Sequence, residues 1–349
     1  MAKTVIGLEI TEESVRAAEV TTKRVPTLVA AGEVPLPPGA AKDSEIVDQD
    51  AVTLALRQLW SRGGFRGKHA VLGIGSRRVM IREHTSQTMR PDLFRRALPF
   101  QVQDLLPVPV EQAVLDFLPT AAHGDQTTGL LVAAVSETLE DLVRAADRAK
   151  IVVDRIDVVP FALARTVRAS RAEGVTAAIH IGDHTTSVVI VEGGFPRFVR
   201  IVPIEVPTDA VRLRLAQERQ DAELEAREPV AVGAPAEAGA APAPSMRSRI
   251  APLAAYDSDP AVADLVGRLR DTIAFYESRA GAHLVSQVAV SGAGAAVPGV
   301  MPGLAGVLSP PVSIVSASDV VATASDIGAV SDLSLNLVST VGLVLGGGR

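Results

Sequence analysis

Alternating apolar and polar residues open the chain and predict an antiparallel meander of three strands. Such alternation is typical of strands that turn one face toward a core. Polar stretches at 11–14 and 22–26 interrupt it and predict the two connecting turns. We therefore predict strands over residues 4–10, 15–21 and 27–34.

A change of spacing after the meander predicts the first helix and a series of strands. Apolar residues at helical spacing mark residues 50–61, and Asp50 is the expected N-cap. A further helix is predicted over residues 160–169. Strands are predicted over residues 69–75, 78–83, 112–118, 130–135 and 151–158.

Two helices are predicted within a compact insert over residues 88–150. The first begins at Pro91, a favoured first helical position, and contains Pro99, which we expect to kink it. The second begins at Ser136, which we expect to act as its cap.

Residues 177–203 repeat the pattern of the opening meander. The offset of the repeat is 180 − 9 = 171 residues, so that His180 matches Glu9, Gly182 matches Thr11 and Asp183 matches Glu12. A repeat that spans about half of the chain predicts a duplicated two-domain architecture.

The second half contains a compositionally distinct stretch. Residues 216–259 are rich in Ala, Pro, Glu and Gly and predict a disordered loop, because they cannot bury enough apolar surface. Helical spacing over 262–276 and a strand over 287–292 follow. The apolar stretch 333–348 is shorter than the roughly 20 residues that span a bilayer, so we expect a buried helix and membrane contact only through a partner.

Composition excludes several classes of function. The formal net charge is −6, which argues against a nucleic-acid partner. Cysteine is absent, which excludes disulfides and Cys-ligated metal sites and fits a cytoplasmic protein. Aromatic residues make up 3% of the chain, so Val, Ile, Leu and Ala must form the cores.

Three polar or Gly-rich turns are the candidates for ligand chemistry. The first two are the meander turns at 11–14 and 182–185, and the third is the stretch 291–299 between a strand and a helix. Glycines there allow a ligand close to the backbone, whose N–H groups can hold anions. No nucleophile motif is found, and a metal site at His180 and His184 is not expected.

In order and spacing, these turns resemble the phosphate-1, phosphate-2 and adenosine motifs of the actin-like ATPase superfamily. Four segments identify the chain as similar to the FtsA/PilM family within it. They are IGLEITEESVRAAEV, PFQVQDLLPVPVEQAVLDF, VDRIDVVPFALAR and VAVSGAGAAVPGV.

The resemblance implies an α/β, actin-like (ribonuclease H-like) duplicated fold with a 1C insert. The first domain would cover residues 1–175, comprising subdomain 1A with 1C inserted at about 79–150. The second would cover 176–349, comprising 2A with a 2B region at about 208–283 that contains the loop 216–259.

The resemblance also implies a nucleotide site for ATP or ADP with magnesium. At that site Glu9 replaces the family's Asp, Thr11 a Gly, Arg16 a Lys and His180 the second acidic residue, so we expect a degenerate site without catalytic residues. The site residues implied by the resemblance are Glu9, Thr11, Ser14, Arg16, Gly182, Asp183, Thr185, Thr186, Gly292 and Gly294.

The implied function is that of a scaffold in type IV pilus assembly. A PilN-like single-span inner-membrane protein would bind through its cytoplasmic N-terminal segment and hold the scaffold at the inner face of the membrane. The expected groove lies between strand 78–83 and helix 93–105, with Leu93, Arg95, Arg96, Phe100 and Leu105 as partner-binding residues.

Several alternatives stay open at this point. One is an active actin-like ATPase, and another is an FtsA-like filament-forming protein. A relative from type II secretion would have the same motifs, and self-association is a further open alternative.

Overall fold

The computed structural model describes residues 3–42, 45–75, 78–225, 259–279, 281–324 and 332–346.

The prediction of a disordered loop over 216–259 is wrong at its start, because α5 (Asp209–Glu225) is helical there. Its sequence is rich in the helix formers Ala, Leu, Glu, Arg and Gln, and Arg214 pairs with Glu218 one turn later at 2.9 Å. Residues 226–258 of that loop lie outside the described residues.

The opening meander forms the middle of a six-stranded sheet. Its strands pair antiparallel, in agreement with the prediction, while β6 and β10 extend the sheet in parallel beside β1. The strand order is β10-β6-β1-β2-β3-β16. The strands are β1 (Thr4–Ile10), β2 (Ser14–Thr21), β3 (Thr27–Pro35), β6 (His69–Ile74), β10 (Val152–Val158) and β16 (Ala322–Thr323).

A second sheet repeats this arrangement in the second half. Its order, β13-β12-β11-β14-β15, matches β3-β2-β1-β6-β10 strand for strand and direction for direction. The predicted duplication is therefore present at the level of sheet topology. The strands are β11 (Val175–Ile181), β12 (Thr185–Glu192), β13 (Phe195–Pro203), β14 (Gln287–Ser291) and β15 (Val312–Ile314).

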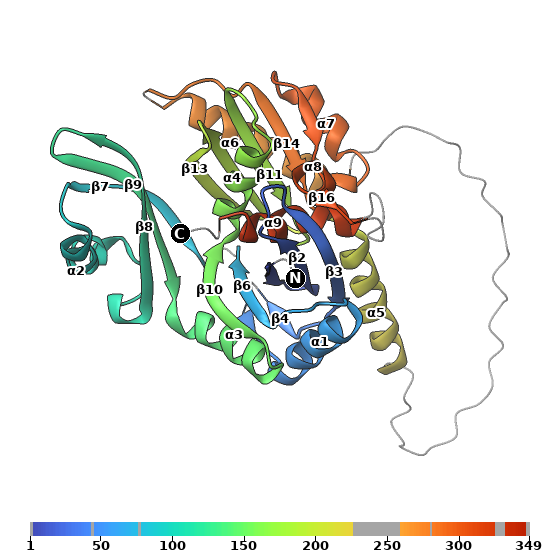
Figure 1. The fold of residues 1–349 in the computed structure, drawn as a ribbon. Coiled ribbons are helices and arrows are strands. Elements are labelled where there is room, and N and C mark those ends of the chain that lie inside the picture. The colour runs from blue at the N-terminus through green and yellow to red at the C-terminus, as the bar shows by residue number, and fades with distance from the viewer. Residues whose placement is uncertain are drawn as a thin grey trace, which may run out of the picture.

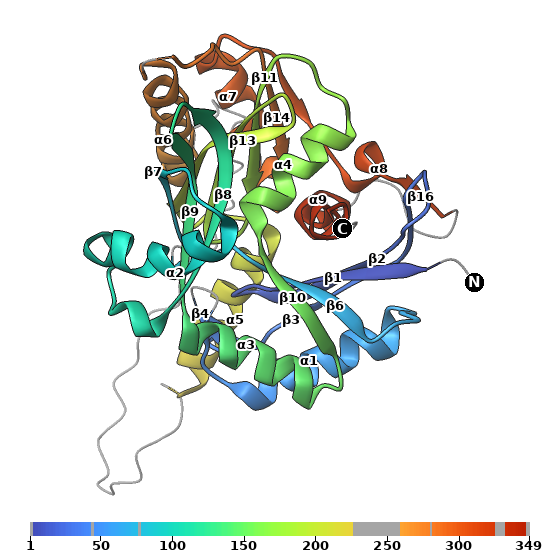
Figure 2. The ribbon, with the colours of Figure 1, turned by 60° about the vertical axis from the view of Figure 1, so that its left-hand side comes forward.

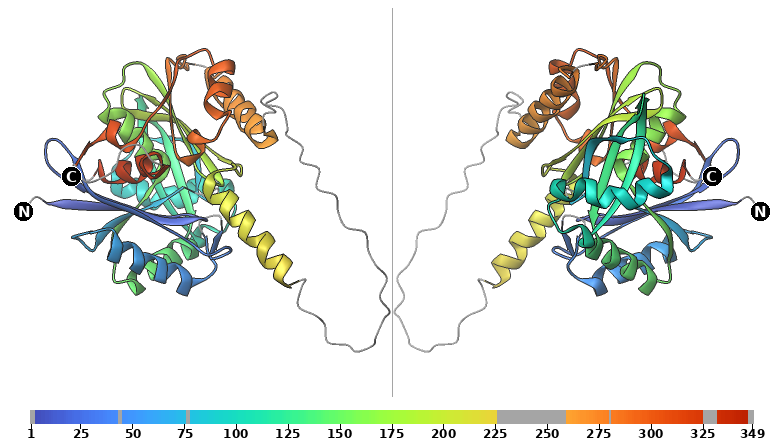
Figure 3. Two further views of the ribbon diagram at one scale, coloured as in Figure 1. Left: turned by 90° about the vertical axis from the view of Figure 1, so that its right-hand side faces the viewer. Right: turned by 90° about the vertical axis from the view of Figure 1, so that its left-hand side faces the viewer.

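Helices cover both sheets and fill the space between them (Figures 1, 2 and 3). The central layer is the pair α4 (Val159–Ala169) and α9 (Asp332–Val344), which pack on each other and on both sheets. The outer helices are α1 (Gln49–Arg62) and α3 (Ser136–Arg148) on the first sheet, and α6 (Pro260–Glu277) and α7 (Val300–Val307) on the second. Short elements β4 (Ala41–Lys42), β5 (Glu45–Ile46), η3 (Ala293–Ala296) and α8 (Ala317–Val320) complete the body.

The insert forms a separate small sheet beside the body, as Figure 1 shows. Its three antiparallel strands have the order β7-β9-β8, and α2 packs over one face through Leu98 and Val102. Pro91 begins α2 and Pro99 lies inside it, as predicted. Its elements are β7 (Met80–Gln87), α2 (Pro91–Val102), η1 (Gln103–Leu105), η2 (Val110–Gln112), β8 (Ala113–His123) and β9 (Gln126–Val135).

The predicted insert also contains α3, which belongs to a different core. Its buried residues Leu139 and Leu142 join the cluster of α1 and the first sheet.

Two predicted helix caps are wrong. Asp48 instead of Asp50 accepts the first backbone N–H groups of α1, and Ser136 is the first residue of α3, where no side chain caps the helix.

Candidate functional site

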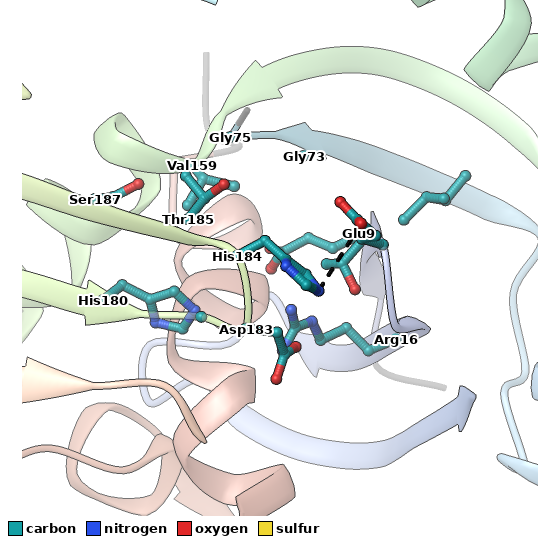
Figure 4. A pocket seen from close by; sticks show the side chains of 14 residues that line it. Glu9, Arg16, Gly73, Gly75, Val159, His180, Asp183, His184, Thr185 and Ser187 are labelled. Atoms are coloured by element: carbon teal, nitrogen blue, oxygen red, sulfur yellow. Dashed lines mark ion pairs between the residues drawn. The ribbon is translucent and has the colours of Figure 1, made fainter. Parts of the chain in front are cut away.

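The two meander turns face each other across a narrow cleft between the halves of the molecule. Figure 4 shows the side chains that line it. Thr11 N donates to Ser14 O at 2.9 Å in the first turn, and Gly182 N donates to Thr185 O at 3.1 Å in the second. These bonds are related by the repeat offset of 171 residues, so the predicted equivalence of the turns is confirmed. The cleft residues are Glu9, Ile10, Thr11, Glu12, Arg16, Gly73, Gly75, Val159, His180, Gly182, Asp183, His184, Thr185 and Ser187.

Glu9 is tied to the central helix α9. Its Oε1 accepts hydrogen bonds from Ser339 Oγ at 2.8 Å and from Thr340 Oγ1 at 2.6 Å, and the residue is 5% exposed. Gly7 permits this approach, because a Cβ there would lie 2.2 Å from the backbone oxygen of Thr340. The carboxylate at the position that the resemblance relates to magnesium therefore has hydrogen-bond partners within the protein, namely the two hydroxyl groups of α9.

His180, on β11 of the second sheet, is held as a neutral side chain. Burial, and next the positive charge of Arg16, lower its pKa to about 3. Its Nδ1 lies within hydrogen-bonding distance of Ser291 Oγ, at 3.0 Å. A neutral imidazole hydrogen-bonded to a buried serine has no negative charge, although the resemblance implies an acidic residue at this position.

Arg16 is the buried cation of the cleft. Burial lowers its pKa, but the carboxylates of Glu9, Glu33 and Asp183 outweigh burial, so the pKa is raised and the side chain is charged. Its Nε and Nη1 have no hydrogen-bond partner within the described part of the chain. Unpaired buried donors are costly, and these two match the chemistry of an oxyanion.

An ionic cluster connects the two turns next to the cleft. His184 Nε2 donates to Glu13 Oε1 at 2.5 Å, and Arg214 Nε of α5 donates to the same oxygen at 2.8 Å. Glu205 pairs with Arg214 at 2.8 Å and with His184 at 3.4 Å. The first turn, the second turn and α5 are thereby connected, and we call these four residues the latch cluster.

The latch cluster shifts the pKa values of its members. Burial raises the pKa of Glu13, but the hydrogen bond and charge of His184 and the charge of Arg214 outweigh it and lower the pKa. Burial lowers the pKa of His184, but the hydrogen bond from its ring to Glu13, together with the charges of Glu12, Glu13 and Asp183, raises it. Each shift favours the charged form.

The predicted nucleotide residues divide into two groups. Glu9, Thr11, Arg16, Gly182, Asp183 and Thr185 line the cleft. The other four do not. Ser14 donates to Glu33 at 2.5 Å, Thr186 is fully buried, and Gly292 and Gly294 pack against Ile181 of β11.

Some residues that bond to the two turns or to Glu9 were not predicted from the sequence. The repeat offset places His184 opposite Glu13, so that pair had a signal in the sequence. Arg214 and the hydroxyl groups of α9 had none, because nothing local relates them to the turns.

A nucleotide with magnesium fits the cleft poorly in this arrangement. The cavity has a volume of about 70 Å³, whereas pockets for nucleotide-sized ligands have about 300–1,000 Å³. Glu9 is occupied by Ser339 and Thr340. Arg16 has two donors without a hydrogen-bond partner among the described residues, and such donors suit a small anion better than a magnesium ion.

The predicted partner-binding residues gather on α2 and the short helix after it. Leu93, Phe100 and Leu105 are exposed, and Phe100 is 78% exposed. Arg95 lines a groove of about 890 Å³ between α2 and β8, whereas the predicted strand 78–83 lines a different groove, on the side of β13. Met80 of that strand packs beside Leu98 and Val102 of α2, so the two elements of the expected groove are in contact but do not line one common groove.

None of the helices in the described ranges has both the length and the apolar character required to cross a bilayer.

Comparisons with known proteins agree with this geometry. A solved PilM–PilN type IV pilus biogenesis complex contains a chain of similar fold, with a TM-score of 0.77, 20% identity and 99% of both chains covered. The ethanolamine utilization protein EutJ from Carboxydothermus hydrogenoformans is similar at a TM-score of 0.50 and 13% identity, over 99% of this chain and 91% of that one. The predicted actin-like duplicated fold is confirmed.

The family comparison matches residues 7–201, from the first strand of the opening meander to the third strand of its repeat. This match covers more than half of the 349 residues, including the insert and both meander turns. The chain therefore belongs to the family of the type IV pilus assembly protein PilM.

Proposed function

We propose that the protein is a scaffold of the type IV pilus assembly machinery that binds the cytoplasmic N-terminal segment of a PilN-like inner-membrane protein. Family membership supports the pilus assignment. The similar chain in a PilM–PilN complex supports the kind of partner. Through that partner the scaffold would be held at the inner face of the cytoplasmic membrane.

The main structural support for this proposal is the groove between α2 and β8. It has a volume of about 890 Å³, within the range of peptide and ligand sites. Its apolar wall includes Phe94 and Phe117, whose rings lie 4.8 Å apart, and Arg95 stands at its edge. Apolar pockets beside an outermost strand suit an extended segment whose alternate side chains enter the groove.

The outward face of α2 offers a second contact. Leu93, Arg96 and Phe100 follow one another at spacings of three and four residues, so they share one face of the helix. That face is exposed and combines two apolar side chains with one cation. With Leu105 of η1, it would hold the part of the partner that follows the segment in the groove.

The cleft supports a scaffold better than an ATPase. Glu9 is bonded to α9, and the neutral His180 supplies no carboxylate, so neither of these two positions is well suited to hold a hydrated magnesium ion. We propose a degenerate nucleotide site in which ATP or ADP binds weakly, with Arg16 as its contact. Because two donors of Arg16 have no partner among the described residues, we propose weak nucleotide binding instead of no binding.

Peptide binding by point variants of the full-length protein tests the proposal. The probe is a fluorescent peptide with the cytoplasmic N-terminal sequence of the PilN-like protein of the same organism. Arg95→Glu should weaken binding about tenfold, since it reverses a charge at the groove. Phe100→Glu should weaken it less, because this residue lies on the second contact.

Matched controls come from exposed residues outside the insert. Phe195→Glu, at the start of β13, and Arg212→Glu, on α5, should bind the peptide as the unaltered protein does. Unchanged affinity in both α2 variants would refute the location. Failure of the unaltered protein to bind the peptide would refute the function.

A further inference from the structure

A second groove lies between the insert and the sheet of the second half. It has a volume of about 810 Å³, and strands β7 and β13 line it together with α6. The lining residues are Val79, Met80, Ile81, Arg82, Glu83, Leu130, Arg197, Phe198, Val199, Arg200, Ile201, Phe275 and Arg279. Figure 2 shows the insert beside β13 and α6.

Both strands of this groove are outermost strands. Within the described ranges, β7 pairs only with β9, and β13 pairs only with β12. Each therefore has one edge whose backbone N–H and C=O groups find no strand partner in the described chain. Such edges are templates for an added strand.

The charge of the groove is positive although the protein is acidic. Four arginines and one glutamate line it, in a chain whose net charge is −6. Arg279 pairs with Glu83 at 2.8 Å, and Arg197 pairs with Glu192 at 3.2 Å. Arg82 and Arg200 are exposed and form no ion pair with a described residue.

Exposed aromatic surface is the third feature. Phe275 of α6 is 55% exposed, and its ring lies 5.9 Å from that of Phe198. The guanidinium carbon of Arg279 lies 5.8 Å from the centre of the Phe198 ring. Aromatic and arginine side chains together are typical of the energetically dominant part of a protein interface.

We propose that this groove binds an extended acidic segment of a partner protein, which adds as a strand to the free edges and alternates carboxylate with apolar side chains. The carboxylates face Arg82 and Arg200, and the apolar side chains contact Phe198 and Phe275. A nucleic acid would satisfy the charges but would leave the strand edges unpaired. This site is separate from the groove of α2 and does not depend on it.

An occupant of the groove contacts two parts of the molecule at once. β7 belongs to the insert, whereas β13 follows directly from β12, whose first residue lines the cleft. Strand addition therefore fixes the insert against the second half. At this groove the two parts are now connected by the ion pair between Arg279 and Glu83, and Arg197 of β13 also donates a hydrogen bond to the backbone oxygen of Thr120 in β8.

Fluorescence anisotropy with the full-length protein tests the proposal. The probe is a labelled decapeptide in which glutamate alternates with valine. A decapeptide of lysine and valine tests charge, the first peptide with alternate amides N-methylated tests strand pairing, and a short single-stranded DNA tests nucleic acid. We expect binding of the glutamate peptide alone, weakened at least about tenfold in the double variant R82E/R200E.

The variant R95E/R96E on α2 is the matched control. It should bind the glutamate peptide normally, whereas R82E/R200E should bind the PilN-like segment normally, so the two proposals can fail independently. Three results would overturn the proposal that the groove between β7 and β13 binds an acidic strand. They are no binding of the glutamate peptide up to about 1 mM, equal binding by R82E/R200E, and equal binding of the N-methylated peptide or the DNA.

Discussion

Glu13 and His184 form a hydrogen bond of 2.5 Å between the two halves of the molecule, and 171 residues separate them. This separation equals the offset of the internal repeat, so the bonded residues occupy equivalent positions in the two meander turns. At the first turn, which the sequence resemblance relates to phosphate binding, the chain has a carboxylate of its own between an imidazole and the guanidinium of Arg214. The latch cluster thus connects the two turns through a carboxylate of the chain itself.

Replacement of the central carboxylate should destabilise the fold. Glu13→Gln leaves His184 and Arg214 without their shared partner, and breaking a buried ionic contact costs about 3 kcal/mol. Urea unfolding followed by circular dichroism measures the change. Glu218→Gln removes an exposed partner of the same arginine and should cost less than about 1 kcal/mol. Equal losses in the two variants would show that the latch contributes no more than a surface pair.

The contribution of His184 should depend on pH. Its pKa is raised in the folded state, so its stabilisation is complete below the unfolded value of 6.5 and is lost as the pH rises through the folded value. The pKa of Glu13 is lowered, so its contribution is present above 4.5 and lost as the pH falls through the folded value. The difference in unfolding free energy between the unaltered protein and His184→Gln should therefore be largest between pH 4.5 and 6.5. A difference that stays constant to high pH would contradict this.

His180 should have the opposite effect on acidification. Its folded pKa of about 3 lies below the model-peptide value of 6.5, so the unfolded state binds a proton that the folded state refuses. Stability should fall as the pH drops from 6.5 toward 3, by up to about 1.4 kcal/mol per unit. His180→Asn keeps a group near Ser291 and should lack this slope relative to the unaltered protein. Parallel pH profiles would show that His180 is accessible to protons.

Magnesium ATP should bind weakly. We expect a dissociation constant above about 0.1 mM, because the cleft is small and Glu9 is engaged with α9. Titration calorimetry should show that Arg16→Ala removes the residual binding, whereas Arg95→Ala, outside the cleft, leaves it. Combined Glu9→Asp, Thr11→Gly and His180→Asp substitutions should tighten it. Submicromolar binding by the unaltered protein would contradict a degenerate site.

Gly292 should be required for folding and not for ligand contact. It has a positive φ of 87°, and a Cβ there would lie 2.2 Å from the backbone oxygen of Ile181. Gly292→Ala should destabilise the protein by about 3 kcal/mol. Gly306→Ala is the matched control, because it has open space in α7 and should be neutral or stabilising. Thermal unfolding of both variants checks the contrast.

The sequence by itself determined the strands, the repeat and the fold class. Alternation is a local property of a strand with one buried face, so β1 was predicted to its ends and β2 and β3 to within one residue. Duplication preserves spacing, so the equivalence of the two turns followed from the offset of 171 residues. Helix caps were less predictable, because Asp48 and Asp50 both offer a suitable carboxylate two positions apart.

Only the tertiary structure decided which groups meet in the cleft and at the grooves. Glu9 contacts Thr340 across 331 residues, and Arg214 contacts Glu13 across 201. No local pattern encodes such distances, because they depend on how α9 and α5 pack against the sheets. For the same reason strand 78–83 and α2, neighbours in sequence, line different grooves: β7 has its free edge toward β13, whereas α2 covers the opposite face of the insert sheet with Leu98 and Val102.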